Sequence, residues 1–457
     1  MKELRNEDKI IDNVKHIHMI GIGGSGMCPI AEILHSKGYI LTGSDNNESD
    51  PLKRIKALGI KVFMGHHPEN VNEAELIIYS AAISKDNPEL VAAAEKGIPT
   101  MERSHALGAI TRKFNNVIGV CGTHGKTTVT SMITHILLLN KQDPTAVIGG
   151  KLPLINSNGI AGKSETMVCE SCEFVDTFLQ LSPDIAVLLN IDNDHLDYFK
   201  TMDNLVLSFH KFLKMSSKCY INGDDELCIK AAMDTNAEIT TFGLSDKNDF
   251  YAENIESGKY GFQFDVMYKG EKLTRLNMHI PGKHNILNGL AGFVSAYKEG
   301  VKPDDIANAL ETFTGAGRRF EFLGEYNGFT LADDYAHHPT EIKATLSAAK
   351  ELSYNNVIAV FQPFTFSRTA LLKDEFTEAL SIADKVILTP IMGSREVNTY
   401  GIYSEMIAEN LKDAVVVDGF ENIADKIIET AKENDIVITM GGGDIYKAAH
   451  IVQEKLS

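Results

Sequence analysis

Residues 117–128 read Val-Ile-Gly-Val-Cys-Gly-Thr-His-Gly-Lys-Thr-Thr, and this stretch indicates the fold more clearly than any other in the chain. Its first four residues, 117–120, form a short apolar run that is typical of a buried strand. The residues after it are apolar at helical spacing: Val129, Met132, Ile133, Ile136 and Leu137. A glycine-rich loop between such a strand and an amphipathic helix binds phosphate through its backbone amides. Lys126 can reach the β- and γ-phosphates of a nucleotide, and the Thr127 hydroxyl can coordinate Mg²⁺.

This loop departs at one position from the usual pattern of such motifs. The pattern G-x-x-x-x-G-K-[ST] places a glycine where this chain has Val120, so only the shorter G-x-x-G-K-T remains. A glycine turn with a purely structural role does not explain Gly-Lys-Thr-Thr at the start of a helix. We therefore interpret the loop as a nucleotide phosphate site, formed by Gly122, Thr123, His124, Gly125, Lys126, Thr127 and Thr128.

Short apolar runs alternate with helical patterns along all 457 residues. This alternation is typical of parallel sheets covered by helices, so the predicted class is α/β. The predicted strands are residues 17–20, 39–42, 60–63 and 76–80, then 117–120, 167–170, 185–191 and 218–222, and finally 357–361, 386–388, 415–417 and 436–440. We predict three domains: a Rossmann-like domain at 1–113, a P-loop ATPase-like domain at 114–320 and a second Rossmann-like domain at 321–457. Strict alternation over residues 260–268 predicts a small antiparallel hairpin in the middle domain.

The composition excludes several classes of protein. A formal net charge of −18 repels nucleic acid and anionic membrane surfaces. No stretch approaches the ~20 apolar residues that cross a bilayer, and the first residues lack the features of an export signal. The six cysteines are irregularly spaced and predict free thiols. We expect a cytoplasmic protein without a nucleic-acid or membrane partner.

Two other patterns resemble metal or redox sites. Cys169 and Cys172 form a C-x-x-C, but no second pair exists, so we expect neither zinc nor redox chemistry there. His16 and His18 lie on one face of a predicted strand, where we expect them to pack or to meet solvent.

A second glycine-rich loop follows the first predicted strand. Residues 21–26 read Gly-Ile-Gly-Gly-Ser-Gly and fit G-x-G-x-x-G, and Asp45 stands nineteen residues further on, at the end of the second strand. Such glycines let backbone N–H groups approach any diphosphate. An NAD-dependent oxidoreductase is therefore one alternative, although it leaves residues 122–128 unexplained, and a glycine turn that only packs helix on strand is another. Two diphosphate sites in one chain suggest a reaction between ATP and a nucleotide-linked substrate.

Two polar residues stand after strands that we expect beside the phosphate loop. Glu170 ends one predicted strand, and His195 follows another. Because the carboxyl ends of parallel strands meet at one sheet edge, both side chains should lie near the loop. The alternatives are a solvated carboxylate for Glu170 and a capped turn for His195.

A family resemblance runs along nearly the whole chain. It is carried by residues 21–27, 43–45, 80–83, 122–128, 190–197, 281–285 with Asn288, 317–321, and 333–341, which read Asp-Asp-Tyr-Ala-His-His-Pro-Thr-Glu. The chain resembles the Mur ligases, most closely their alanine-adding branch. The resemblance implies that UDP-N-acetylmuramate binds the first domain, ATP with Mg²⁺ (or Mn²⁺) the second, and L-alanine the third. It implies that the sugar's lactyl carboxylate takes the γ-phosphate to form an acyl phosphate, which alanine's amine then attacks. We expect a monomer or a weak homodimer.

The resemblance also implies roles for individual residues. The residues matching catalytic positions are Lys126, Glu170, His195 and Arg368, and those matching metal positions are Thr127, Glu170 and His195. The ATP positions beyond the loop are His284, Asn285, Asn288, Arg319 and Asp334. The UDP-sugar positions are Gly21, Gly23, Gly24, Ser25, Gly26, Asp45, His66, Ser80 and Ala81. The amino-acid positions are Tyr335, His337 and Arg368.

The chain differs from other branches and from its own branch at a few positions. Relatives that act later carry a carbamylated lysine where this chain has Phe209, which agrees with the alanine-adding branch. The family usually has histidine at Phe364, and some members have arginine at Thr365, so Arg368 would carry more of the alanine recognition. Two alternatives stay open: a ligase that attaches recycled tripeptide to the same UDP sugar, and a nucleotide-binding regulator without turnover.

Overall fold

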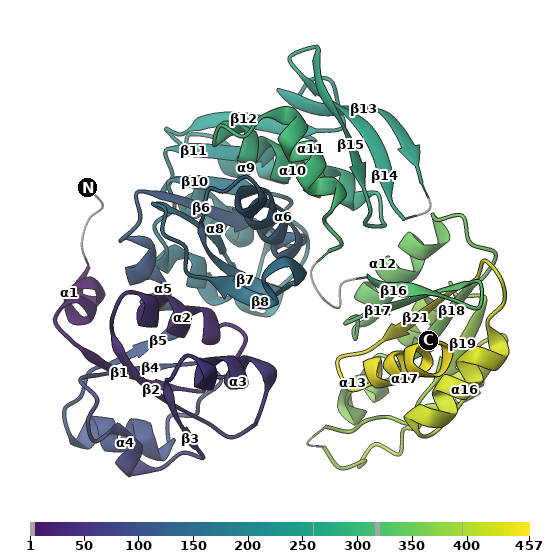
Figure 1. The fold of residues 1–457 in the computed structure, drawn as a ribbon, viewed down its shortest axis with the longest axis horizontal. Coiled ribbons are helices and arrows are strands. Elements are labelled where there is room, and N and C mark those ends of the chain that lie inside the picture. The colour runs from purple at the N-terminus through teal and green to yellow at the C-terminus, as the bar shows by residue number, and fades with distance from the viewer. Residues whose placement is uncertain (1–4, 259, 316–319, 395) are drawn as a thin grey trace. The chain divides into compact units, whose positions relative to one another are not determined.

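The computed structural model contains three β-sheets that follow one another along the chain, with helices packed on them (Figure 1). It describes residues 5–258, 260–315, 320–394 and 396–457. The chain divides into two compact units. The first unit comprises Met1–Glu253, Asp265–Leu276 and Leu287–Leu310, and the second comprises Asn254–Phe264, Asn277–Ile286 and Glu311–Ser457.

The first sheet has five strands in the order β3-β2-β1-β4-β5, all parallel. Its strands are β1 (His16–Ile20), β2 (Ile40–Asp45), β3 (Lys61–Met64), β4 (Leu76–Tyr79) and β5 (Thr100–Glu102). Its helices are α1 (Asn6–Asp12), α2 (Cys28–Ser36), α3 (Asp50–Ala57), η1 (Pro68–Val71), α4 (Pro88–Glu95) and α5 (Arg103–Thr111). Because the strands run in one direction, the segments that follow β1 to β4 lie at a single edge, where such sheets bind ligands.

The second sheet has ten strands in the order β15-β14-β13-β12-β11-β10-β6-β9-β7-β8. Its strands are β6 (Asn116–Cys121), β7 (Thr145–Leu152), β8 (Ser157–Ile160), β9 (Thr166–Glu170), β10 (Ile185–Leu188), β11 (Lys218–Asn222), β12 (Glu238–Gly243), β13 (Phe250–Ser257), β14 (Phe262–Tyr268) and β15 (Glu271–Met278). The helices after these strands are α6 (Lys126–Leu139), η2 (Pro153–Ile155), η3 (Phe174–Gln180), α7 (Leu196–Phe199), α8 (Met202–Leu213), α9 (Glu226–Ala232), α10 (His284–Lys298) and α11 (Pro303–Glu311). Strand β6 pairs in parallel with β9 and with β10, so the loop that follows β6 is flanked by the segments that follow both neighbours.

The predicted hairpin is formed by β14 and β15, which are neighbours in this sheet. They are joined by Lys269 and Gly270, with φ of 49° and 88°. Two consecutive positive φ values are typical of a type I′ turn, whose twist matches that of a hairpin. The strand starts at Phe262 and not at Tyr260.

The third sheet has six strands in the order β16-β17-β21-β18-β19-β20. Its strands are β16 (Glu321–Tyr326), β17 (Phe329–Asp334), β18 (Val357–Phe361), β19 (Lys385–Leu388), β20 (Ala414–Val416) and β21 (Ile436–Met440). Its helices are α12 (Pro339–Lys350), α13 (Phe366–Leu371), α14 (Lys373–Leu380), α15 (Glu405–Ala408), α16 (Phe420–Thr430) and α17 (Tyr446–Leu456). All pairs are parallel except β16 with β17, so the carboxyl ends of β17, β21 and β18 meet at one edge.

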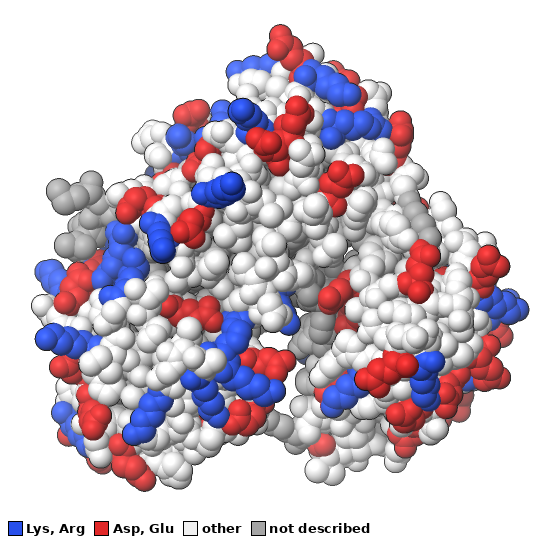
Figure 2. Space-filling model, in the orientation of Figure 1, with Lys and Arg blue, Asp and Glu red and all other residues white. Residues whose placement is uncertain are grey.

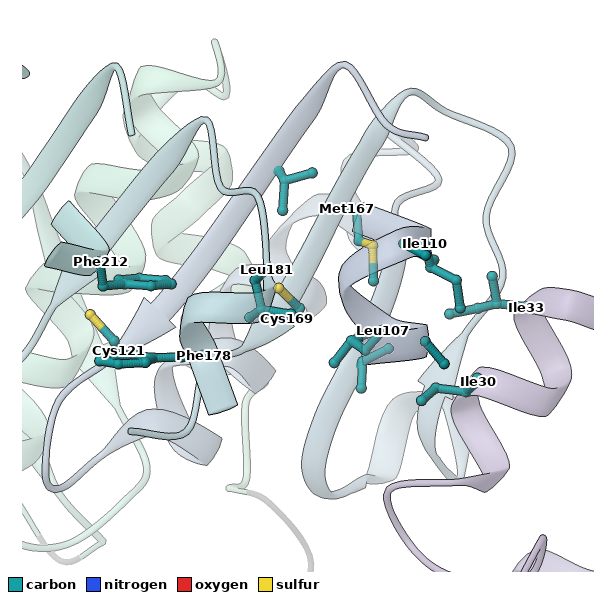
Figure 3. Close-up of a cluster of buried hydrophobic side chains, with 14 of the residues drawn as sticks. Ile30, Ile33, Leu107, Ile110, Cys121, Met167, Cys169, Phe178, Leu181 and Phe212 are labelled. Atoms are coloured by element: carbon teal, nitrogen blue, oxygen red, sulfur yellow. The ribbon is translucent and has the colours of Figure 1, made fainter. Parts of the chain in front are cut away.

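One apolar core supports both sheets of the first unit (Figure 3). Its buried members include Ile30, Ile33, Leu107, Ile110 and Met167. In the same core the ring of Phe178 stacks on that of Phe212, with centroids 4.6 Å apart and 4° between the planes. Since each fully buried side chain of this kind contributes ~1.5–3 kcal/mol, the core fixes α2 and α5 against the middle sheet.

The structure confirms the α/β class and every predicted strand, each within three residues at both ends. The apolar pattern did not predict β5, β7, β8, β12, β13, β16 and β17. Strands such as β8, which reads Ser-Asn-Gly-Ile, carry too few apolar residues to produce a periodic signal. The domain boundaries after residues 113 and 320 stay predictions.

Three further features concern the surface and the thiols of the molecule. Within the described ranges, no helix combines the length and the apolar character needed to cross a membrane. Figure 2 shows Lys and Arg side chains interspersed with Asp and Glu on the face in view. All six cysteines are free thiols, and Cys172 is the exposed one, so Cys169 and Cys172 form no disulfide.

Candidate active site

The loop after β6 has the backbone geometry that close phosphate binding requires. Gly122 and Gly125 have φ of 134° and 86°, a region that residues with side chains rarely adopt. A Cβ on Gly125 would lie 2.6 Å from Asn288 Oδ1, so close packing also demands glycine there. Helix α6 begins at Lys126, and the amides of its first turn therefore form a site for an anion.

Lys126 is held inside this loop by an ion pair. Its Nζ donates to the carbonyl oxygens of Gly122 (2.6 Å) and Thr123 (3.0 Å) and lies 3.1 and 3.0 Å from the two carboxylate oxygens of Glu173. The lysine side chain is 13% exposed and the glutamate side chain 1%. Burying a carboxylate to this degree costs much free energy unless a cation or several hydrogen bonds compensate its charge, and here Lys126 is the cation. The loop thus carries a positive charge whose counter-ion a phosphate can replace.

Sequence reasoning missed Glu173. It stands three residues after Glu170, beyond the end of β9, and belongs to no periodic pattern. The chain reverses immediately afterwards, where Val175 and Asp176 have φ of 54° and 56°. Because β9 is the neighbour of β6, this reversal brings Glu173 back to the loop. The Glu-x-x-Glu spacing after a strand beside a phosphate loop was the available signal.

The segment after β10 holds the loop from its other flank. Thr123 N–H donates to Asn190 O (3.0 Å) and His124 N–H to Asn190 Oδ1 (2.8 Å), while Asn190 Nδ2 donates back to His124 O (3.0 Å). Asp192 N–H donates to Thr123 Oγ1 at 2.9 Å. Thr123 is buried by these bonds, whereas the His124 side chain is exposed. The two residues therefore anchor the loop, and only His124 offers a side chain to a ligand.

Glu170 and His195 lie at the same sheet edge, as the strand order predicted. Glu170 Oε2 accepts a hydrogen bond from Gly149 N–H at 2.7 Å. The His195 ring centroid is 4.7 Å from that of Phe174, the residue next to Glu173. His195 has a φ of 55°, so the turn that presents it is backbone-strained. The metal role of both residues stays a prediction.

The donor set around the loop fits Mg²⁺ that arrives with a nucleotide. The described residues contain no group of three His, Cys, Asp or Glu side chains placed to hold a metal alone. Mg²⁺, however, commonly takes one or two carboxylates and completes its shell with water and substrate phosphates. Glu173 Oε2 is buried and, within the described chain, accepts no hydrogen bond, being engaged only in the ion pair with Lys126. The Thr127 hydroxyl on the first turn of α6 supplies a second hard oxygen.

The residues predicted for adenine recognition lie on α10. Asn288 is buried against Gly125, at the phosphate loop. Asn285 is also buried, and its Nδ2 donates to Pro281 O at 2.5 Å, while His284 is exposed. His284 and Asn285 fall in the second compact unit. Arg319, predicted for the phosphates, lies outside the described residues.

The loop after β1 is supported from within by β2. Gly21 N–H and Ile22 N–H donate to Ser44 O at 2.8 and 3.2 Å. Gly23 N–H donates to Asp45 Oδ2 at 2.9 Å, so the carboxylate predicted for the ligand also fixes the loop. A Cβ on Gly23 would lie 3.0 Å from that oxygen, which explains the glycine. The loop is therefore held in place by Ser44 and by Asp45, the acidic residue predicted together with the G-x-G-x-x-G motif.

The tip of this loop is open to an anion. Among the described residues, none accepts a hydrogen bond from the N–H groups of Ser25 and Gly26. A Cβ on Gly26 would lie 3.2 Å from Arg103 Nη1, so this guanidinium reaches over the tip. No acidic side chain of the described chain forms an ion pair with Arg103. This arginine was not identified as a site residue from the sequence. Ser80 is close to Gly21, with its Cβ 3.8 Å from where a Cβ on Gly21 would stand, and Ala81 next to it is exposed.

His66 lies at the same edge, after β3, with one ring nitrogen turned inward. Its Nδ1 is 3.0 Å from Glu89 Oε2 and 3.1 Å from Ser44 Oγ. The His66 side chain is 13% exposed, whereas that of Glu89 is fully buried. The predicted ligand contact of His66 must therefore involve its other nitrogen.

In the second unit, Asp334 shapes the segment predicted to meet the amino acid. Its Oδ2 accepts from Phe320 N–H and its Oδ1 from Ala336 N–H, both at 2.7 Å. These bonds fix the chain on both sides of Tyr335, whose ring lies 5.2 Å from that of His337. Asp334 is 6% exposed, and each of its carboxylate oxygens accepts a hydrogen bond from a backbone N–H of its own unit.

Arg368 stands on α13 with part of its guanidinium unsatisfied. Its Nη1 is buried and has no hydrogen-bond partner among the described residues. Thr365 caps this helix, because its Oγ1 accepts from Arg368 N–H at 3.4 Å. Hydrogen bonds from Ser367, with a smaller contribution from the charge of Arg368, lower the pKa of Glu396. Thr365 therefore has a structural role, and Arg368 is a cation able to receive a carboxylate.

Three family models together match most of the chain. The model described as "Mur ligase family, catalytic domain" matches residues 16–115, "Mur ligase middle domain" residues 120–296, and "Mur ligase, glutamate ligase domain" residues 318–443. The first match spans the first sheet, the second contains the phosphate loop, and the third contains Asp334 and Arg368.

Individual relatives match over nearly their full length. The UDP-N-acetylmuramate–L-alanine ligase of Clostridium botulinum is 42% identical over 452 residues, which cover 97% of this chain and 98% of that protein. The crystal structure of UDP-N-acetylmuramate-alanine ligase from Thermotoga maritima matches with a TM-score of 0.81 at 29% identity, over 96% of this chain and 98% of that one. A murein peptide ligase from Psychrobacter arcticus matches with a TM-score of 0.68 at 24% identity, over 97% and 99% of the two chains, which shows a shared fold.

Proposed function

Because the chain belongs to the Mur ligase family, we propose that it is an ATP-dependent ligase that joins L-alanine to UDP-N-acetylmuramate. The products are UDP-N-acetylmuramoyl-L-alanine, ADP and phosphate, in peptidoglycan synthesis. The observation that carries this proposal is the 42% identity to an alanine-adding relative over 97% of the chain. Since the reaction consumes ATP and a UDP-linked sugar, it belongs in the cytoplasm.

The phosphate loop supports the first half of the reaction. Phosphoryl transfer requires positioning and neutralisation of charge more than covalent help from the protein. Lys126 exchanges Glu173 for the β- and γ-phosphates of ATP, and the amides that open α6 bind the same oxygens. The lactyl carboxylate attacks the γ-phosphorus, the bond to the β-phosphate oxygen breaks, and ADP leaves.

The other two sites hold the partners of the acyl phosphate. The amides of Ser25 and Gly26, together with Arg103, bind the UDP diphosphate. Arg368 binds the alanine carboxylate through its unsatisfied guanidinium. Alanine's uncharged amine attacks the acyl carbon, and the tetrahedral intermediate expels phosphate as the amide forms.

Residues around the loop also fit a divalent cation. Thr127 and Glu173 would hold it by their oxygens, with Glu170 and His195 beside them. When bound, Mg²⁺ lowers the charge repulsion between the attacking carboxylate and the phosphates. With a metal bound, Glu173 would have the cation as its partner in place of Lys126, so its buried charge would stay compensated.

If Glu170 and His195 lie beside the metal, their loss should weaken the response of the enzyme to Mg²⁺. We expect Glu170→Ala and His195→Ala each to raise the Mg²⁺ concentration that gives half-maximal activity by about tenfold or more, as losses around a metal usually do. Magnesium titrations at saturating ATP measure this shift. His35→Ala is the matched control, because His35 is an exposed imidazole on α2 that we place at no site. Unchanged titration curves for both variants would remove the two residues from the site.

The ligation itself is tested by its product. Mass spectrometry of a reaction with ATP, UDP-N-acetylmuramate and L-alanine should show the sugar nucleotide with one alanine residue added and one ADP formed for each product. ATP consumption without an aminoacylated sugar nucleotide would contradict the proposal. A tight complex with NADH would favour the oxidoreductase alternative instead.

A further inference from the structure

A fully buried carboxylate lies directly beneath the ligand edge of the first sheet. Glu89, near the start of α4, has a side chain with 0% exposure. Ser44 Oγ and Asn70 Nδ2 each donate to it at 2.6 Å, and His66 Nδ1 lies 3.0 Å away. His18 Nε2, on β1, is 3.5 Å from Glu89 Oε1. A buried charge costs much free energy unless it is fully compensated, so this cluster calls for an explanation.

The charge state of Glu89 is set by these partners. Burial alone would raise the pKa of Glu89, but the nearby His18 imidazole and the hydrogen bonds from Ser44 and Asn70 outweigh it and lower the pKa to about 2. The group is therefore a carboxylate at neutral pH. Since a carboxylate only accepts hydrogen bonds, His66 must carry its proton on Nδ1 to pair with it.

Two connections lead from Glu89 to the ligand edge of the first sheet, one of them to the loop at residues 21–26. The first passes through Ser44, whose side chain donates to Glu89 while its carbonyl oxygen accepts from Gly21 N–H at 2.8 Å. The second passes through His66, whose Nε2 has no hydrogen-bond partner among the described residues and is not enclosed by the protein. With Nδ1–H directed at a carboxylate, the ring is fixed and Nε2 is the nitrogen left for a ligand.

We propose that Glu89 is a positioning residue for the UDP sugar, holding the His66 imidazole with Nε2 toward an oxygen of the ligand and fixing Ser44 under the diphosphate loop. This inference rests on the proposed function, because it takes the UDP sugar as the ligand of the first sheet. Glu89 touches no substrate. It acts through His66 and Ser44, in the way that an outer carboxylate orients a metal-bound histidine.

The test is calorimetry of UDP-N-acetylmuramate binding without ATP. Glu89→Gln and His66→Gln should each weaken binding by about tenfold, the effect of losing one charge-assisted hydrogen bond. The double variant should bind no more weakly than either single one, because both changes remove the same contact. The control is Thr42→Val, which removes the hydroxyl that contacts His18 Nδ1 at 2.9 Å on the far side of the cluster. It should lower the melting temperature and leave the affinity unchanged.

A spectroscopic readout separates positioning from loss of structure. In ¹⁵N spectra of labelled histidine, His66 should carry its proton on Nδ1 in the wild type. It should shift toward the Nε2–H tautomer in Glu89→Gln, because the new amide can donate to Nδ1. An unchanged tautomer, or wild-type affinity in Glu89→Gln beside weakened binding in His66→Gln, would overturn the inference.

The same titrations distinguish this inference from the function on which it rests. Gly23→Val serves as the loop variant, because its side chain would press on Asp45 Oδ2 and on Leu52. If the wild type does not bind the UDP sugar, the proposed function and this inference both fail. If the wild type binds and Gly23→Val does not, while Glu89→Gln binds normally, only this inference fails.

Discussion

Lys126→Ala should reduce turnover by about 10³-fold, the loss expected when one preorganised charge is removed from a transition state. In the free protein, Nζ of Lys126 is bound by two loop carbonyls and by Glu173. In the reaction, the same group neutralises the transferring phosphoryl group. Single-turnover measurement of phosphate release from ATP would give the rate directly, and turnover near that of the wild type would refute the assignment of the loop.

The ion pair makes a second variant necessary. Removing Lys126 leaves the Glu173 carboxylate, which is 1% exposed, without its cation, and breaking a buried pair costs about 3 kcal/mol or more. Lys126→Ala should therefore melt at a lower temperature than the wild type. In the double variant Lys126→Ala/Glu173→Gln the buried charge is gone, so stability should recover while turnover stays low. Recovery of both would show that the single variant fails through folding.

Arg368→Ala should raise the Michaelis constant for alanine by about 150-fold or more, since a bidentate arginine contributes two charge-assisted hydrogen bonds of ~1.5–3 kcal/mol each. Affinities for ATP and the UDP sugar should not change, because Arg368 is proposed to touch neither. Arg368→Lys is the matched control, because it keeps the positive charge but loses the bidentate guanidinium. Its Michaelis constant for alanine should lie between those of the wild type and Arg368→Ala. An Arg368→Ala enzyme that saturates normally with alanine would remove Arg368 from the amino-acid site.

A companion variant tests the departure of this chain from its family. Phe364→His restores a donor where the family usually has one, and we expect it to lower the Michaelis constant for alanine. Thr365 is unsuitable for this purpose because its hydroxyl caps α13. A histidine variant no better than the wild type would show that the departure is compensated elsewhere.

The parts of the sites that follow strands directly were predictable from the sequence. Parallel strands deliver their carboxyl ends to one edge, so the positions of Lys126, Glu170 and His195 at or beyond the ends of buried strands were enough to predict that they share this edge. The same rule placed Asp45 at the glycine-rich loop after β1. These positions were predictable because the signal, a buried apolar run followed by polar residues, is local in sequence.

The residues that the sequence did not reveal are joined by long-range contacts. Glu173 pairs with Lys126 across 47 positions, and Glu89 bonds to Ser44 across 45. Arg103 reaches Gly26 from the start of α5. Apart from the Glu-x-x-Glu spacing at Glu173, no local pattern marks these charges, and the role of each depends on a partner that only the fold supplies.

The most direct test of the proposed activity is phosphate release from ATP in the presence of UDP-N-acetylmuramate, with alanine, serine, glycine and the recycled tripeptide each supplied alone. We expect alanine to give the highest kcat/KM, serine and glycine to react more slowly, and the tripeptide to release no phosphate above background. Release with the tripeptide but not with alanine would contradict the alanine-adding function and favour the recycling ligase.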